Sequence, residues 1–247
     1  MIAPALGGFL AHRYGFAMIF VVSAAVAAVA LLLSLFLPND RAGGAELDDD
    51  DDISLRQFFE IFKAPRLVPI YAVIVVNMFM VGILFGFLPV YLYAIGYTPL
   101  QSGAVVSVAT LSYLLVQPLT GALADRVAAR ETVFVGLLLA ALAIVAVTFT
   151  VGVPLIITVI VAGIGIGTVW TNSDTLVSAL AEPGQLGASI GAAQSFKEFG
   201  DMIGPLLIGL LTQLFGVRAG FIVCGALALL FLVVLASTQM REQRRDA

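Results

Sequence analysis

A chain of 247 residues with 61% hydrophobic and only 11% charged residues is too apolar for a water-soluble globular protein, whose apolar share is about 45–50%. The composition predicts an all-helical bundle that crosses a membrane several times. The net charge of −4 comes mostly from Glu46 and the five aspartates at 48–52, so the chain has a local acidic segment. We expect a lipid bilayer around the protein and no nucleic-acid partner.

Enzymatic and metal chemistry find little support in the residue content. The chain holds one histidine, His12, and one cysteine, Cys224, and it lacks a serine nucleophile elbow. The aspartate run has neither the alternating ligands nor the turn glycine of a calcium loop. We therefore expect no enzymatic activity, no cofactor and no metal site.

Apolar runs of about 20 residues, the length that crosses about 30 Å of hydrocarbon, recur along the chain after a short stub at 2–11. The seven predicted spans are 16–37, 67–93, 100–122, 132–151, 154–175, 188–215 and 217–237. Four short joints predict tight turns between antiparallel helices, at Gly15, Gly96, Gly152 and Gly216.

These runs predict four parts of the chain. Residues 1–37 form the end of a first bundle, 38–66 an acidic linker, 67–238 a six-helix bundle and 239–247 a tail. The linker is expected to be solvated, because five adjacent carboxylates repel one another and bury nothing.

The basic residues fall mainly on one set of connections, which predicts the cytoplasmic side. This set is Arg41, Arg56, Lys63, Arg66, Arg126, Arg130, Arg241, Arg244 and Arg245, and the opposite set is Arg13 and Arg218. The rule places the linker, the turn at 182–184 and the C-terminus on the cytoplasmic face of the inner (plasma) membrane.

Segments 4–20 and 205–221 share a spacing. In both, a glycine follows the first proline by four residues, a joint glycine by 11 and a phenylalanine by 16. The matched landmarks are Pro4, Gly8, Gly15 and Phe20 in the first and Pro205, Gly209, Gly216 and Phe221 in the second. This suggests an internal duplication of the kind that builds transporters from two six-span bundles.

The loop Gly121-Ala122-Leu123-Ala124-Asp125-Arg126, followed by Arg130, resembles the cytoplasmic signature of the major facilitator superfamily between its spans eight and nine. Ala128 stands where that signature usually has a glycine. The stub resembles the end of span five, whose helix-packing signature pairs Gly-Pro with Gly-Gly, although Ala3 replaces the first glycine. The residues carrying this second likeness are Pro4, Gly7, Gly8, Gly204, Pro205 and Gly209.

The resemblance implies a secondary active transporter that moves a small solute by alternating access, with proton-coupled efflux favoured by the Pro-Gly signatures. It also implies that the chain runs from the end of span five to span twelve, so it would be N-terminally truncated and its partners would include the missing N-terminal helices. The alternative is a non-transporting membrane half-module that binds a partner bundle, or a degenerate remnant.

The signature loop is a candidate conformational switch. Its candidate residues are Gly121, Asp125, Arg126 and Arg130. Asp125 can cap or pair with a helix terminus, and the two arginines can hold carboxylates of a facing bundle. The alternative is an ordinary solvated turn.

Four ionisable residues, Asp174, Lys197, Glu198 and Asp201, lie within or beside apolar spans, where such groups are often functional. From the helical rise, Asp174 lies about 30 Å and Asp201 about 21 Å from the outer ends of their spans. Lys197 can pair with Asp201, four residues on, or with Asp174 on the preceding helix. The pair could close a cytoplasmic gate, a carboxylate could couple protons, or all four could be structural.

Four polar or aromatic residues are candidates for a solute cavity: Asn77, Trp170, Thr171 and Gln194. Trp170, Thr171 and Asp174 continue a face that begins at Gly163 and Gly167, and this face either packs on a neighbouring helix or lines the cavity. Asn77 is equally suited to a ligand or to a helix interface.

Overall fold

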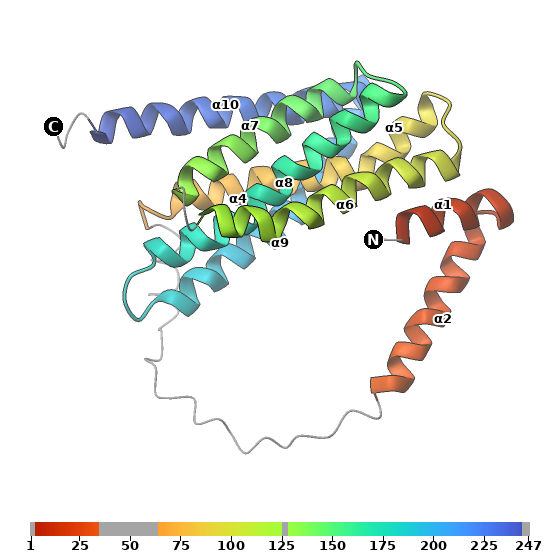
Figure 1. The fold of residues 1–247 in the computed structure, drawn as a ribbon, viewed down its shortest axis with the longest axis horizontal. Helices are drawn as coiled ribbons and strands as arrows, with labels where there is room; N and C mark the ends of the chain where they lie inside the picture. Colours follow the sequence, from red (N-terminus) through yellow and green to blue (C-terminus); the bar gives the residue numbers. More distant parts are fainter. Residues whose placement is uncertain (1–2, 35–63, 125–127, 244–247) are drawn as a thin grey trace.

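The computed structural model describes residues 3–34, 64–124 and 128–243, and the regular structure within these ranges is helical (Figure 1). This confirms the all-helical membrane architecture predicted from composition. The acidic run at 48–52, Asp125 and Arg126 lie outside the described residues.

The helices follow the apolar runs. They are α1 (Ala3–Tyr14), α2 (Phe16–Ser34), α4 (Val68–Val81), η1 (Gly82–Phe87), α5 (Leu88–Ala94), α6 (Pro99–Ala124), α7 (Ala129–Val147), α8 (Val153–Leu180), α9 (Leu186–Phe215) and α10 (Val217–Gln243). α10 continues beyond its predicted end at 237 into the predicted tail, because a helix does not have to end where its apolar stretch ends.

Five stretches within the described residues are long and apolar enough to cross a membrane. They are Phe16–Leu33, Val68–Ala94, Pro99–Leu123, Ala129–Val147 and Val153–Leu180. α10 adds a shorter apolar stretch, Val217–Val233. α9 is longer than any of these but carries Lys197, Glu198 and Asp201 inside it.

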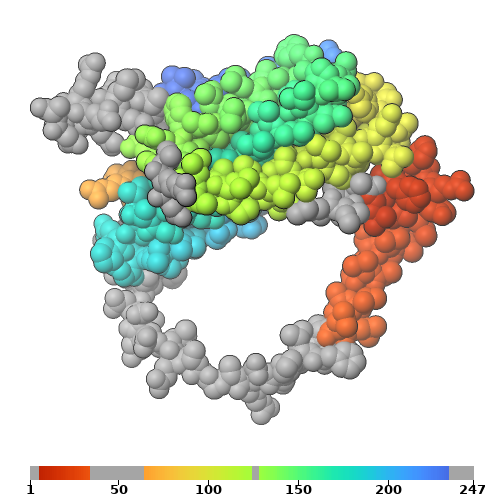
Figure 2. Space-filling view, in the orientation of Figure 1, coloured from red at the N-terminus to blue at the C-terminus, as the bar shows by residue number. Residues whose placement is uncertain are grey.

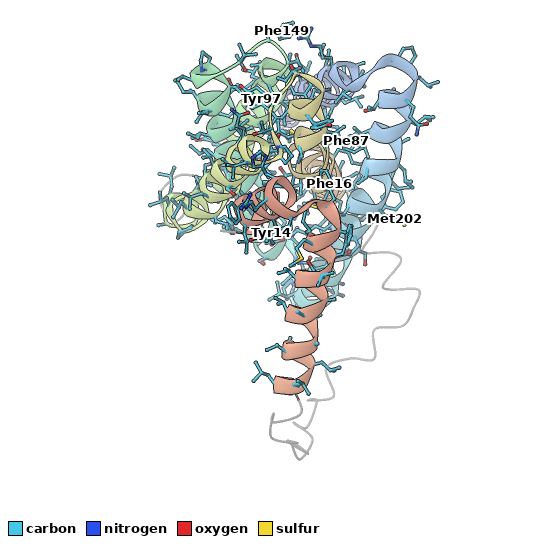
Figure 3. The ribbon with its side chains drawn as sticks, turned by 90° about the vertical axis from the view of Figure 1, so that its right-hand side faces the viewer. Tyr14, Phe16, Phe87, Tyr97, Phe149 and Met202 are labelled. Carbon is cyan, nitrogen blue, oxygen red and sulfur yellow. The ribbon has the colours of Figure 1, made fainter. Side chains whose placement is uncertain are left out.

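Glycines in the left-handed backbone region form the four predicted tight turns. Their φ angles are +84° at Gly15, +93° at Gly96, +63° at Gly152 and +86° at Gly216. A side chain would strain the backbone at these angles, so glycine allows each helix to reverse within a few residues. At one of these turns the Gly152 N–H donates to the Tyr97 hydroxyl at 3.0 Å, and Figure 3 shows Tyr97 and Phe149 at this end of the bundle.

The centre of the bundle is α8, whose glycines let α6 and α7 approach its backbone. A Cβ atom on Gly163 or Gly167 would lie 2.5 Å from a carbonyl oxygen of α6. A Cβ atom on Gly165 would lie equally close to the backbone nitrogen of Ala140 in α7, at 2.5 Å. Helices that meet through small residues in this way gain close van der Waals contact without relying on water.

A π-helical turn, η1, separates α4 from α5 within what the sequence predicts as one uniform span. The Leu88 N–H donates to the carbonyl of Ile83, five residues earlier. Pro89 has no N–H with which to continue the α-helical ladder, and Gly82 and Gly86 make irregular backbone less costly. These glycines and the proline permit the turn, but such residues also occur in regular membrane helices and do not by themselves predict it.

The two N-terminal helices, α1 and α2, differ in how they pack on the rest of the bundle. α1 packs on α6, where a Cβ atom on Gly8 would lie 2.5 Å from the Pro99 carbonyl oxygen. α2 stands away from the bundle (Figures 1 and 2), and none of the residues Phe16–Leu33 is buried. Figure 3 shows side chains of α2 extending to both sides of the helix, away from the bundle. A helix that is apolar all round needs lipid or other apolar helices around it.

Candidate functional site

Lys197 is the only buried charged residue in the part of the chain that the structure describes, with 4% of its surface exposed. Its Nζ donates to both carboxylate oxygens of Asp174, at 2.8 Å to Oδ1 and 2.7 Å to Oδ2. The Asp174 side chain is 40% exposed, against 5% for Lys197. The ion pair therefore joins α9 to α8 with its cation fixed inside and its anion at the edge of the protein.

The same ammonium group lies over an aromatic ring. Lys197 Nζ is 4.6 Å from the centre of the Trp170 ring, a distance at which the π face attracts a cation. Trp170 precedes Asp174 by one helical turn on α8, so the ring and the carboxylate share one face of that helix. Lys197 is thus held by two groups of the same helix face.

A series of aromatic contacts leads away from the ion pair. Tyr113 of α6 meets Trp170 edge to face, with ring centres 6.0 Å apart. Phe85 of η1 meets Tyr113 in the same manner at 5.7 Å. The π-helical turn and α6 thus contribute two rings to an aromatic wall that ends at Trp170.

This aromatic wall borders a cavity of about 790 Å³, within the size range of small-molecule sites. The N-terminal helices supply another part of its lining, including Gly7, Gly8 and Phe16. No charged residue of the described chain lines the cavity. Tyr113 was missed by sequence reasoning, because an aromatic residue in an apolar span gives no signal of the partners it meets.

Of the four residues expected in a solute cavity, the structure places Trp170 in the cavity wall. Asn77 is buried between α4 and α8, where its Nδ2 lies 3.5 Å from the Ile166 carbonyl oxygen. Thr171 faces the end of α6 that carries Gly121, with its methyl carbon 3.7 Å from where a Cβ atom on that glycine would lie. Gln194 is exposed on α9.

Gln194, Glu198 and Asp201 form a polar face on α9. All three are exposed, and their spacing of four and three residues puts them on one side of the helix. Lys197 does not pair with Asp201, since its ammonium group lies on Asp174. Ionisable residues within a span usually face water or a protein surface rather than lipid, so we expect this face of α9 to border water or protein.

The structure describes the candidate residues of the switch loop and of the helix-packing signature, except Asp125 and Arg126. Gly121 lies near the end of α6 and Arg130 is exposed in the first turn of α7. Pro4 lies in α1. In the second copy of the packing signature, α9 lies on α4 and η1: a Cβ atom on Gly204 would be 3.0 Å from Phe79, and one on Gly209 would be 3.7 Å from Phe87. The Pro205 ring lies against Gly82.

Comparison with known proteins gives a family match over nearly the whole chain. The model described as Major Facilitator Superfamily matches residues 1–112 and 70–246. Multidrug resistance protein MdtG of Klebsiella pneumoniae (strain 342) is 25% identical over 254 residues, which cover 100% of this chain and 61% of that protein. The protein of the same name from Citrobacter koseri is 25% identical over 251 residues, 99% of this chain and 61% of its own length. The chain thus spans 61% of the length of these relatives.

Proposed function

The chain belongs to the major facilitator superfamily, and we propose that it takes part in moving a small solute across the cell membrane by alternating access. The observation that carries this proposal is the Lys197–Asp174 pair, which joins α8 to α9 beside an aromatic cavity. With the pair closed, the two helices are held together. When the pair separates, they can part and change access to the cavity.

We further propose that the transport is efflux coupled to protons. The relatives carry the name multidrug resistance protein, which supports outward movement of foreign compounds. Asp174 is 40% exposed and can receive a proton, and a neutral Asp174 holds Lys197 less strongly than a carboxylate does. Asp201, on the polar face of α9, is a second candidate for the coupling proton.

A complete solute path in this proposal needs a second bundle of helices beside this one. We propose that the chain lies in the inner (plasma) membrane, with its own C-terminus in the cytoplasm. Two surfaces suit such a partner: the bare apolar sides of α2 and the polar face of α9. The exposed surface of α2 equally supports the alternative, a half-module that binds a partner bundle without transporting.

The test is movement of a fluorescent apolar dye out of vesicles that carry a pH gradient and contain the chain together with a separately produced second bundle. We expect movement with the natural chain and loss of it with Asp174→Asn or Lys197→Met. Glu182→Gln, which removes a carboxylate from an exposed turn, is the matched control and should leave movement unchanged. If the natural chain moves no dye but co-purifies with a separately produced partner bundle, the half-module function replaces the transporter.

A further inference from the structure

We propose that the solute is an amphipathic anion, whose acidic group replaces the Asp174 carboxylate on Lys197 while its apolar body lies along Trp170 toward the cavity. The physiological meaning of this inference rests on the proposed transport function. Binding itself can be measured without transport.

The unequal burial of the ion pair is the first reason. Lys197 is almost fully enclosed, and an enclosed ammonium group is costly unless an anion lies beside it. Asp174 has 40% of its side chain exposed, so it can turn toward water at small cost and leave Lys197 to another anion. A cationic ligand would have to take the place of the Lys197 ammonium group and so expel a side chain that is only 5% exposed. The geometry therefore selects the sign of the ligand charge.

The lining of the cavity is the second reason. It is built from apolar, aromatic and small residues, and no carboxylate of the described chain is among them, so a cationic ligand finds no counter-charge there. Lys197 does not line the cavity, but its Nζ lies 4.6 Å from the centre of the Trp170 ring, and Trp170 does line it. A ligand with an apolar body in the cavity and an acidic group at its end matches both the apolar lining and the ammonium group of Lys197.

The spacing on α8 is the third reason. Asp174 follows Trp170 by four residues, which places their Cβ atoms about 5–6 Å apart on one helix face. A single aromatic ring carrying a carboxylate has about this length. Its carboxylate can occupy the position of the Asp174 oxygens while the ring lies against the indole.

Trp170 makes the proposal directly measurable, because it is the only tryptophan in the chain. A bromine atom quenches tryptophan fluorescence at short range, so binding of a brominated ligand beside Trp170 is measured as a loss of fluorescence. The chain is placed in nanodiscs of phosphatidylcholine, whose headgroup has no net charge, and titrated with 4-bromobenzoate, 4-bromobenzamide and 4-bromobenzylammonium. These three probes share a ring and differ in charge.

We expect the carboxylate to quench at concentrations about tenfold lower than the amide, since one charge-assisted hydrogen bond is worth about one factor of ten in affinity. The ammonium probe should quench least. Equal quenching by carboxylate and amide in the natural chain would overturn the proposal.

Two variants distinguish binding of the anion at Lys197 from a general attraction of anions to a chain with less negative charge. Lys197→Met should remove the preference for the carboxylate over the amide. Asp174→Asn should bind 4-bromobenzoate several-fold more tightly than the natural chain, because the competing carboxylate is gone. Glu182→Gln changes the net charge by the same amount away from the site and should bind as the natural chain does. Tighter binding in both carboxylate variants would show general attraction and overturn the proposal.

The two proposals fail in different ways. Anion binding without dye movement leaves the anion site standing and removes the transport function. Dye movement without preference for the carboxylate removes the anion site and leaves transport standing.

Discussion

Lys197 and Asp174 differ in burial, and this difference determines which of the two is costlier to lose. Asp174→Asn leaves an ammonium group enclosed without a counter-charge, whereas Lys197→Met leaves a carboxylate that water can reach. We expect Asp174→Asn to be less stable than Lys197→Met by about 1–3 kcal/mol. The measurement is the fraction of chain that stays monodisperse in detergent after heating.

The double variant Asp174→Asn/Lys197→Met provides the internal control for this prediction. With both charges removed, no buried charge lacks a partner, so the double variant should be more stable than Asp174→Asn alone. Equal losses in the two single variants would mean that Lys197 has access to another anion when Asp174 is gone.

At the residue scale, the sequence alone could not identify the ion-pair partner of Lys197. Asp201 lies four residues away on the same helix and Asp174 lies 23 residues away on another, and spacing alone allows both. The choice depends on how α8 and α9 face each other, which is a property of packing. The sequence therefore predicted the candidates, and the structure selected Asp174.

Asp125 carries a prediction from the signature loop. Asp125→Asn removes a charge that can pair with a neighbouring helix terminus while keeping the size of the side chain. In vesicles that hold the chain together with its second bundle, we expect dye movement to fall, with the amount of chain in the membrane fraction unchanged. Normal movement by correctly inserted Asp125→Asn protein would refute the switch role of this loop.

At the element scale, α8 depends on the absence of side chains where it crosses α6. A Cβ atom on Gly163 or Gly167 would lie within 2.5 Å of α6 backbone, so neither clash can be relieved by turning a side chain. We expect Gly163→Ala and Gly167→Ala each to destabilise the bundle by about 1–3 kcal/mol, the usual cost of overpacking. Heating in detergent followed by gel filtration measures the effect.

Gly191 in α9 is the matched control, since no atom beyond the backbone of its own helix lies within 4 Å of where its Cβ atom would be. Gly191→Ala should be neutral or stabilising by up to about 1 kcal/mol, because alanine favours the helix. If all three alanine variants behave alike, helix propensity rather than the crossing of α6 and α8 sets the effect of these glycines.

The elements themselves were largely predictable, because a membrane-spanning helix is recognised by the length of its apolar run and a tight turn by its glycine. Two features were not. The π-helical turn η1 depends on how backbone groups are satisfied locally, and α10 continues to Gln243 past its apolar stretch. Hydropathy indicates where a helix meets lipid, and it says little about backbone irregularity or the helix end.

At the scale of the whole molecule, the cavity joins segments that are distant in the sequence. Gly8 in α1, Phe85 in η1, Tyr113 in α6 and Trp170 in α8 all line it. Each is an ordinary residue of an apolar span, and what makes them a site is the packing of α1 on α6 and of α6 on α8. Residue type and spacing within one helix carry no information on this, so the site could not be assembled from the sequence.

The orientation of the bundle in the membrane gives a final prediction, based on the distribution of basic residues. The turn between α7 and α8 should face outward and the turn between α8 and α9 should face the cytoplasm. Phe149 is 75% exposed in the first turn and Glu182 is exposed in the second. Cys224, the only natural cysteine, is 4% exposed and can be replaced by alanine to remove background labelling.

In the Cys224→Ala background, Phe149→Cys should react with a membrane-impermeant maleimide in intact cells. Glu182→Cys should react only after the cells are permeabilised. α8 joins the two turns as a single helix of 28 residues, long enough at about 1.5 Å per residue to cross the hydrocarbon, so the two sites should label from opposite sides. The reverse pattern would invert the bundle and place the Lys197–Asp174 pair near the outer surface, where it would control outward rather than cytoplasmic access.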